Sequence, residues 1–215
     1  MKFVMAYSCG KDSTLALHHM IMEKNEPVAL LTMVNQEEER SFFHGADYNM
    51  LEAYSEALGV PVLITPTTGD QYHLAMERSL KEAVTLGAEI ACFGDIDIEG
   101  NRAWSEERCA NVGIPSVFPL WQKERSENVY ELVRLGYKCL IKSINNTLLP
   151  KELLGRMIDQ EVIEIMKAHQ IDICGENGEY HTLVVDGPIF QKRLGYQTGK
   201  ILDFGEFSVI EITIA

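Results

Sequence analysis

The stretch that decides the fold is "MKFVMAYSCGKDST", residues 1–14, in which an apolar run leads directly into a polar turn. The apolar part predicts a buried β-strand, and the amphipathic segment after Ser13 predicts a helix. Gly10, Lys11 and Asp12 stand between the two. A turn at the carboxyl end of the first strand is the usual anion site of an open α/β sheet. The stretch therefore predicts a strand–turn–helix unit that binds phosphate.

Each residue type in this loop suits a phosphate ligand. Successive backbone N–H groups and the N-terminus of the following helix present donors and a positive dipole to an anion. Ser8 and Ser13 offer hydroxyl donors, Gly10 allows close approach of the backbone, and Lys11 adds charge. Asp12 suits a magnesium ion better than a phosphate. A plain helix cap is the simpler alternative, but the position directly after the first strand favours phosphate binding.

The same strand–helix alternation continues beyond this loop. Repeated alternation of this kind predicts a doubly wound, parallel five-stranded sheet. The pattern then changes to a helix, a polar cluster and strand-like alternation, so we expect a sheet domain over 1–145 and a small α+β domain over 146–215. The predicted strands are 2–8, 27–35, 61–66, 89–95 and 114–121, and the predicted helices after the first are 47–58, 72–87, 104–113 and 126–136.

Composition excludes several classes of function. The chain has 215 residues, of which 46% are hydrophobic and 24% charged, as in ordinary soluble proteins. A net charge of −13 repels a phosphate backbone, so no nucleic-acid partner is expected. No apolar stretch approaches the roughly 20 residues that cross a bilayer, and the N-terminal run is too short for the core of a signal peptide. We therefore expect a cytoplasmic protein without a membrane partner.

The cysteines indicate neither disulfides nor a zinc site. They are odd in number and widely spaced, and no CxxC pair occurs. Cys92 and Cys139 lie in apolar runs and are expected to be core thiols. The five cysteines are Cys9, Cys92, Cys109, Cys139 and Cys174.

A second polar cluster, "CGENGEYHT", spans residues 174–182. It brings carboxylates, an amide, an imidazole and a hydroxyl together within a few positions, which is too polar for a core. A solvated turn that bends at Asn177–Gly178 is the simpler alternative. A plain turn, however, has no need for Glu, Glu, His and Thr side by side, so the cluster is a candidate site.

The first loop resembles the Ser-Gly-Gly-x-Asp-Ser loop of the N-type ATP pyrophosphatases. Members of that superfamily cleave ATP to AMP and pyrophosphate while they adenylate a carbonyl or carboxyl oxygen. Cys9 stands where the first Gly of that loop usually lies. Its Cβ is expected to prevent a freely positive φ and to place a thiol beside the phosphates. Cys9 then acts as a small residue or, alternatively, has a redox or sulfur-carrying role.

The second cluster and the segment "FGDIDIEGNRAWSEERCANVGIPSVFPLW" (93–121) resemble the diphthine–ammonia ligase family, particularly its bacterial-type branch. The similarity runs along essentially the whole chain. It implies an ATP-binding domain of the adenine nucleotide alpha hydrolase-like (HUP) type and a small substrate domain. It also implies an amide ligase with ATP and Mg²⁺ as cofactors. The carboxylate of diphthine, on elongation factor 2, is adenylated, and ammonia from ammonium then displaces AMP.

This resemblance implies a role for each matching residue. The expected nucleotide-binding residues are Ser8, Gly10, Lys11, Asp12, Ser13, Met33 and Val34. The expected catalytic residues are Asp95, Glu176, Glu179 and His181. The expected substrate-binding residues are Arg40, His44, Asn177 and Thr182, and the expected magnesium ligands are Asp12 and Asp95. A carboxylate pair in the second cluster would bind ammonium and take its proton.

Some of these expectations have simpler alternatives. Asp95 would bind magnesium or the attacking amine, or would only cap the next helix. The backbone at the end of the second strand would flank adenine, and the loop that follows it would close over the nucleotide. Arg102, Trp104 and Glu107 form a weaker set, because exposed helix charges explain two of them equally well.

Three further questions stay open at this stage. In an organism without diphthamide, the same chemistry would serve a small metabolite. A second possible function is sulfur insertion, as in tRNA-thiolating relatives, which would need a cysteine pair or an RNA-binding surface. A third is a non-catalytic ATP or AMP sensor, which would leave the second cluster without a role. The apolar alternation of "FSVIEITIA" (207–215) fits pairing within the small domain or across a homodimer.

Overall fold

The computed structural model describes residues 1–42 and 44–215. The first part of the chain forms β1 (Lys2–Ala6), α1 (Lys11–Met22), β2 (Glu26–Asn35), β3 (Arg40–Ser41), α2 (Tyr48–Leu58), β4 (Val62–Thr67), α3 (Tyr72–Thr85), β5 (Ile90–Cys92), α4 (Glu99–Val112) and β6 (Ser116–Val117). The second part forms α5 (Arg125–Arg134), β7 (Lys138–Asn145), the 3₁₀-helix η1 (Lys151–Leu153), α6 (Gln160–Ala168), β8 (Tyr180–Asp186), β9 (Tyr196–Asp203) and β10 (Phe207–Ile214). Among the described residues, no helix has the length and apolar character needed to span a membrane.

The parallel strands confirm the predicted fold class. In the described part of the chain they lie in the order β4-β2-β1-β5-β6, and the short β3 pairs antiparallel with the end of β2. The chain fills one side of β1 first and then the other, which places the carboxyl end of β1 at a topological switch point. The fifth predicted strand is shorter than expected, because only Ser116–Val117 pairs before Pro119 interrupts the extended run.

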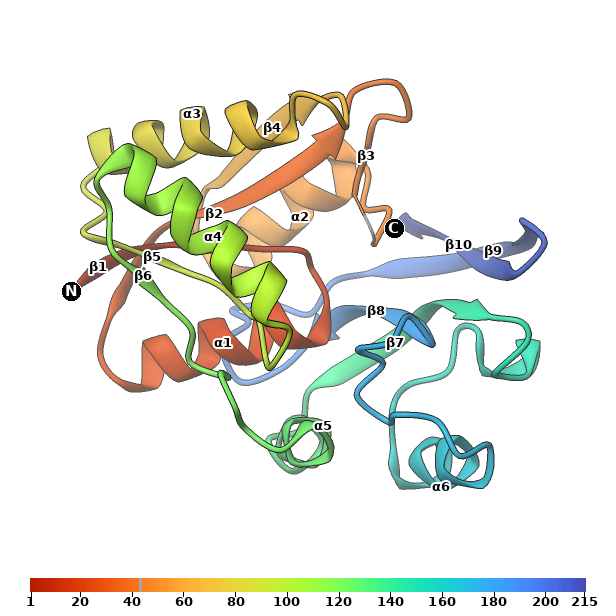
Figure 1. Ribbon diagram of the computed structural model, residues 1–215. Helices are drawn as coiled ribbons and strands as arrows, with labels where there is room; N and C mark the ends of the chain where they lie inside the picture. Colours follow the sequence, from red (N-terminus) through yellow and green to blue (C-terminus); the bar gives the residue numbers. More distant parts are fainter. Residues whose placement is uncertain (43) are drawn as a thin grey trace.

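Helices cover both faces of this sheet, with α3 and α4 on one face and α1 and α2 on the other (Figure 1). Successive side chains of β1 point to opposite faces of the sheet, so they pack against different helix layers. Val4 packs in one buried cluster with Leu80 of α3, whereas Met5 packs in another with Leu15 of α1 and Leu51 of α2. The first strand is therefore buried on both faces.

A second, antiparallel sheet has the strand order β8-β7-β10-β9. It begins with β7, which lies within the 1–145 range that the sequence assigned to the sheet domain. The apolar run of β7 looks like a further strand of the parallel sheet, but both strands that pair with it come later in the chain. The two sheets share one hydrophobic cluster, in which Tyr7 and Leu15 pack together with Leu140 and Val184. The chain thus has two sheets but a continuous core.

Lys142 of β7 is a buried lysine, only 4% exposed, whose Nζ donates a hydrogen bond to the backbone carbonyl of Ile210. Burial lowers the pKa of Lys142 to about 8, and the charge of Arg40 adds to this effect. At neutral pH Lys142 is therefore charged, and the burial of this charge lowers the stability of the folded state.

This site predicts a pH dependence of stability. Between pH 8 and 10.5 the unfolded chain holds a proton on Lys142 that the native protein lacks, so the stability lost to burial of the charge is regained as pH rises. We expect the free energy of unfolding of the wild type, minus that of Lys142→Met, to increase by up to about 3 kcal/mol over this interval. Urea titrations at pH 7, 8, 9 and 10 measure the difference. A difference that is the same at every pH would contradict the assignment.

Candidate functional site

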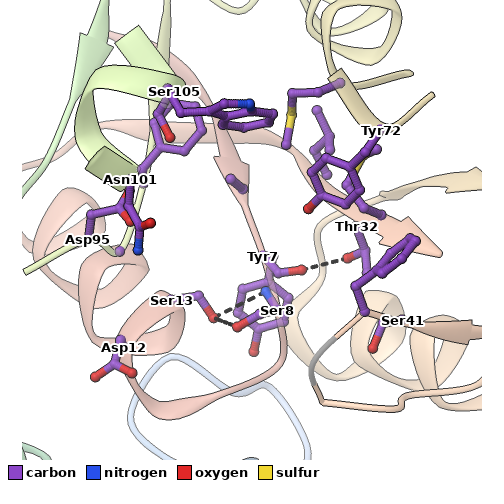
Figure 2. A pocket seen from close by; sticks show the side chains of 18 of the residues that line it. Tyr7, Ser8, Asp12, Ser13, Thr32, Ser41, Tyr72, Asp95, Asn101 and Ser105 are labelled. Carbon is purple, nitrogen blue, oxygen red and sulfur yellow. Dashed lines mark hydrogen bonds between the residues drawn. The ribbon is translucent and has the colours of Figure 1, made fainter. Parts of the chain in front are cut away.

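A cavity of about 590 Å³ opens at the carboxyl ends of β1, β2 and β5. Figure 2 shows Ser8, Asp12 and Ser13 at one end of it and Tyr72 and Ser105 at the other. The lining residues are Ala6, Tyr7, Ser8, Asp12, Ser13, Leu31, Thr32, Met33, Ser41, Phe42, Gly69, Tyr72, His73, Met76, Phe93, Gly94, Asp95, Asn101, Trp104 and Ser105. One end is therefore polar and acidic, and much of the remaining wall is aromatic or apolar. Such a cavity suits a ligand with a flat apolar part and an anionic part.

The predicted phosphate loop is held in shape by its own hydroxyl groups. Ser13 Oγ donates to the carbonyl of Gly10 over 3.1 Å, and Ser8 Oγ lies 3.0 Å from Ser13 Oγ. The backbone N–H of Ser8 donates to Ser13 Oγ (Figure 2). The backbone N–H of Gly10 donates to Ser8 Oγ. Helix α1 begins at Lys11 without a side-chain cap from its own sequence. The loop therefore has a defined shape at the N-terminus of α1, and phosphate binding there stays a prediction.

Cys9 corrects two expectations. Its φ is +67°, in the left-handed region that the Cβ was expected to prevent. Its thiol is fully buried in the core rather than beside the phosphates, and burial raises its pKa well above the ordinary value. The carbonyl of Cys9 accepts a hydrogen bond from the N–H of Val184 over 2.9 Å. This bond and the burial hold a conformation that costs a non-glycine residue about 1–2 kcal/mol.

Lys11 and Asp12 form an ion pair at the start of α1. The two Asp12 oxygens lie 2.9 and 2.7 Å from Lys11 Nζ, and Lys11 is only 5% exposed. Burial disfavours the charge of Lys11, but the carboxylates of Asp12 and Glu176 help to outweigh it and its pKa is raised. Asp12 lines the cavity, while Lys11 lies behind it, 4.0 Å from Glu176 Oε1. The pair therefore stands between the cavity and the second polar cluster.

Two further carboxylates near Asp12 have raised pKa values. Burial raises the pKa of Asp95 to about 6, and the charge of Asp12 contributes. Burial also raises the pKa of Glu176 to about 7, again with a contribution from Asp12. Mutual repulsion of this kind is relieved by a cation or a proton. The arrangement therefore favours cation binding or proton transfer at this end of the cavity.

The residues present fit a magnesium ion. Asp12 and Asp95 both line the cavity, and their oxygens are the hard ligands that Mg²⁺ prefers. Ligand atoms of Asp12, Cys174 and Glu176 also lie within 4.8 Å of one another. That second group contains a soft thiol and already holds the ammonium of Lys11. Asp12 belongs to both groups, and Asp12 with Asp95 is the candidate magnesium pair because both carboxylates line the cavity.

The second cluster is split between surface and interior. Glu179 is buried, and its carboxylate accepts hydrogen bonds from the backbone N–H and the side-chain amide of Asn177, at 2.9 and 3.1 Å. Asn177 is exposed. Glu176 turns toward Lys11, and burial lowers the pKa of His181. The structure therefore brings Glu176 and His181 to the start of α1, whereas Glu179 shapes the loop.

His44 covers the phosphate loop from the side of β8. Its Nδ1 lies 2.7 Å from the carbonyl of Thr182, which can only accept, so Nδ1 carries the hydrogen. Burial lowers the pKa of His44 to about 3, and the ring of His181 lies 5.1 Å away. A Cβ on Gly10 would come within 2.3 Å of the imidazole of His44. Gly10 has a φ of −86°, which any residue can adopt, so glycine is required here for the contact with His44 and not for the turn.

Thr182 supplies the cap that α1 lacks. The N–H of Lys11 donates to Thr182 Oγ1 over 3.1 Å, across 171 positions of sequence. Thr182→Val would leave this buried N–H without an acceptor, so we expect a loss of about 1–2 kcal/mol in the free energy of unfolding. Chemical denaturation measures it, with Thr182→Ser as the variant that keeps the hydroxyl. Equal losses in both variants would contradict the capping role.

Three other predicted residues, Met33, Val34 and Arg40, differ in where they lie relative to the cavity. Met33 lines it, but its carbonyl already accepts from the N–H of Phe42 over 3.2 Å. Val34 points into the core on the opposite face of the sheet. Arg40 is exposed and donates to the carbonyl of Gly45. The loop after β2 therefore reaches the cavity through Ser41 and Phe42 rather than through Arg40.

Two protein-family models together match most of the chain. The model of the diphthamide synthase N-terminal domain matches residues 1–116, and that of the diphthamide synthase C-terminal domain matches residues 124–214. The chain belongs to the diphthamide synthase family. The resemblance seen in the sequence is thereby confirmed.

Relatives of this family member carry the name diphthine–ammonia ligase. The chain is 24% identical to that of Saccharomyces cerevisiae, over 89% of the chain and 34% of the relative, and 26% identical to that of Schizosaccharomyces pombe, over 90% and 36%. It is 23% identical to that of Homo sapiens, over 94% and 85%. The chain thus spans about a third of the length of the two yeast relatives. A solved structure titled as a predicted subunit of tRNA methyltransferase from Methanocaldococcus jannaschii is 16% identical, with a TM-score of 0.46 over 90% of this chain and all of the other.

The diphthamide synthase family member also has site residues that sequence reasoning missed. The aromatic wall consists of Phe42, Tyr72 and Trp104, of which only Trp104 had been noted as a weak candidate. Asn101, Trp104 and Ser105 share one face of α4, and this spacing was a usable signal. Gly94 lies so close to α1 that a Cβ there would come within 3.0 Å of the backbone of Asp12 and Ser13. Arg102 stacks on Trp121, 4.7 Å from the ring centre, outside the cavity lining.

Proposed function

We propose that this member of the diphthamide synthase family is an ATP-dependent amide ligase. A carboxylate oxygen attacks the α-phosphorus of ATP, the bond to pyrophosphate breaks, and an acyl adenylate forms. Ammonia then attacks the acyl carbon, the bond to AMP breaks, and the amide is released. Adenylation turns a carboxylate that resists attack into an acyl group with a good leaving group.

The observation that carries this proposal is the position of the Lys11–Asp12 pair. Asp12 lines the cavity at the phosphate loop, and Lys11 lies against both Asp12 and Glu176 of the second cluster. A nucleotide phosphate in the loop and an amine held by Glu176 would therefore meet at the start of α1. This juxtaposition is what a two-step reaction at one carbon requires.

Each group then has a chemical task. Ser8, Gly10 and Ser13 bind the pyrophosphate portion of ATP, and the aromatic wall of the cavity receives the base. Glu176, with its pKa of about 7, accepts a proton from ammonium so that ammonia becomes a nucleophile. His181, beside Lys11 and Asp12, borders the acceptor. Glu179 and Thr182 hold the loop and the helix in place.

Magnesium is the cation that Asp12 and Asp95 fit. When bound, it neutralises charge on the phosphate oxygens and so favours attack at phosphorus. The protein's own contribution is the placement of the two carboxylates at the polar end of the cavity.

The acceptor we propose is the carboxylate of diphthine on elongation factor 2, because the curated relatives are named for it. A small-metabolite carboxylate is the alternative acceptor, and ammonium is the co-substrate of both. We propose the cytoplasm as the location. The nucleotide tasks then fall within residues 1–145 and most acceptor tasks within 146–215.

The test is a product assay. Purified protein is incubated with ATP, Mg²⁺ and ammonium, with and without diphthine-bearing elongation factor 2, and AMP and pyrophosphate are quantified. AMP that forms only with the factor would support ligase and acceptor together. AMP formed with another carboxylate would retain the chemistry and change the acceptor. ATP binding without AMP under any condition would overturn the proposal in favour of a sensor.

A further inference from the structure

Arg125, the first residue of α5, joins loops from both halves of the molecule. Its Nε and Nη2 donate to the two oxygens of Asp97, at 2.7 and 2.8 Å. Its Nη1 donates to Asp172 over 2.6 Å and to the side-chain oxygen of Asn177 over 3.3 Å. A planar guanidinium with a fixed set of donors is suited to hold two carboxylates at a set distance.

The residues that Arg125 holds are neighbours of the candidate catalytic carboxylates. Asp97 follows Asp95 by two positions, in the loop after β5. Asp172 opens the loop that carries Glu176, and its other oxygen accepts from the N–H of Cys174 over 2.9 Å. Arg125 therefore ties the loop of Asp95 to the loop of Glu176. These two loops flank Asp12, whose charge raises the pKa of both carboxylates.

The geometry differs from that of an ordinary surface ion pair. The side chain of Arg125 is 27% exposed and that of Asp172 is 14% exposed. On the same helix, Arg134 pairs with Glu127, and the two are 59% and 54% exposed. Exposed pairs of the second kind contribute little to structure. The helix thus supplies its own matched control.

We propose that Arg125 is a positioning residue that sets the distance between the Asp95 and Glu176 loops around Asp12. It acts through Asp97, Asp172 and Asn177 and touches no reacting atom. The catalytic part of this inference rests on the proposed function. Misplacement of a reacting group by about 1 Å is enough to lower a rate 10²-fold.

The test compares Arg125→Gln, Arg125→Lys and the control Arg134→Gln. Hydrogen exchange is measured for residues 93–98 and 172–179, because this measurement does not depend on activity. We expect faster exchange in both segments for Arg125→Gln, about tenfold, and wild-type exchange for Arg134→Gln. Unchanged exchange in Arg125→Gln, with the protein folded, would overturn the proposal.

The kinetic arm separates positioning from simple tethering. We expect kcat for AMP formation to fall on the order of 10–100-fold in Arg125→Gln, with KM for ATP within about threefold, because the phosphate loop is untouched. Arg125→Lys keeps the charge but lacks the forked donors, so it should recover less than half of the loss. A wild-type kcat in Arg125→Gln, or full recovery in Arg125→Lys, would overturn the role.

A failure of the proposed function would be visible separately. Wild-type protein that forms no AMP refutes the ligase, whatever the variants do. In that case the exchange measurement alone decides whether Arg125 holds the two loops. Faster hydrogen exchange in only one of the two segments would also contradict the inference, since Arg125 would then not connect the two loops.

Discussion

Asp12→Asn is expected to lower the rate of AMP formation on the order of 10³-fold. The substitution keeps the shape of the side chain but removes the charge that faces both the cavity and Lys11. With Asp95 left as the sole carboxylate of the proposed magnesium pair, several kcal/mol of charge stabilisation are lost at the phosphates. Initial rates of AMP and pyrophosphate release, measured across a range of Mg²⁺ concentrations, test this result.

The same substitution also leaves Lys11 buried without its closest partner. Removal of one member of a buried ion pair costs about 3–5 kcal/mol when both groups are inaccessible, and Asp12 is partly exposed, so we expect a smaller loss of stability here. Thermal unfolding must therefore accompany the rates. Asp70→Asn, an exposed carboxylate beside the cavity residues Gly69 and Tyr72, should remain within twofold of wild type. If folded Asp12→Asn kept more than a tenth of the activity, Asp12 would have no role in the chemistry.

Glu176→Gln is expected to separate the two half-reactions. Amide formation should fall about 10²–10⁴-fold, the usual contribution of a positioned base, because Gln cannot accept the proton of ammonium. Adenylation needs no such base, so acceptor-dependent exchange of pyrophosphate into ATP should stay within about threefold. Isotope exchange measures the first step, and mass spectrometry of the acceptor measures the second.

A glutamate elsewhere in the same part of the chain provides the comparison. Glu164 on α6 is exposed and pairs with Lys167, and Glu164→Gln should leave both steps unchanged. Equal losses in the two half-reactions of Glu176→Gln would instead assign Glu176 to nucleotide binding. Higher ammonium concentrations should restore the rate only in part, because the variant lacks the proton acceptor as well as the charge that holds ammonium.

The strand–turn–helix unit of residues 1–14 was predictable because its signals are local. A buried strand, a turn with small residues and a helix follow one another within residues 1–14, and the helical start places N–H groups at the turn. Asp95 was also accessible to sequence reasoning, since the ends of parallel strands meet at one edge of a sheet. Cys9 was not, because its positive φ depends on a partner in β8.

The second cluster was only partly predictable because Glu176 and Glu179 lie in the loop before β8, whereas Thr182 lies in the strand itself. Within nine positions, Glu176 faces Lys11, Glu179 is buried under Asn177, and Thr182 reaches the backbone of α1. The direction of each side chain depends on the pairing of β8 with β7, and the local sequence pattern does not predict that pairing. The same holds for Arg125, whose partners lie 28 and 47 positions away.

The aromatic wall shows a third limit. Phe42 lies in the turn after β3, whereas Tyr72 and Trp104 lie in α3 and α4, where each fits an ordinary amphipathic position. Only the packing of α3 against α4 brings Tyr72 and Trp104 to a ring distance of 5.7 Å. Chemistry spread over several elements is therefore recovered from the fold and not from the sequence alone.

The hydrogen bonds between the phosphate loop and β8 have a consequence for biosynthesis. The cap on the first helical N–H comes from a residue 171 positions later, and contacts this distant form late in folding because a long loop must first close. While the chain is being made, the parallel sheet can assemble on the ribosome before its nucleotide loop is complete. We expect the nascent protein to acquire affinity for ATP only after β8 has emerged. Until then, the early half of the chain would not bind cellular ATP, which only the complete chain can use.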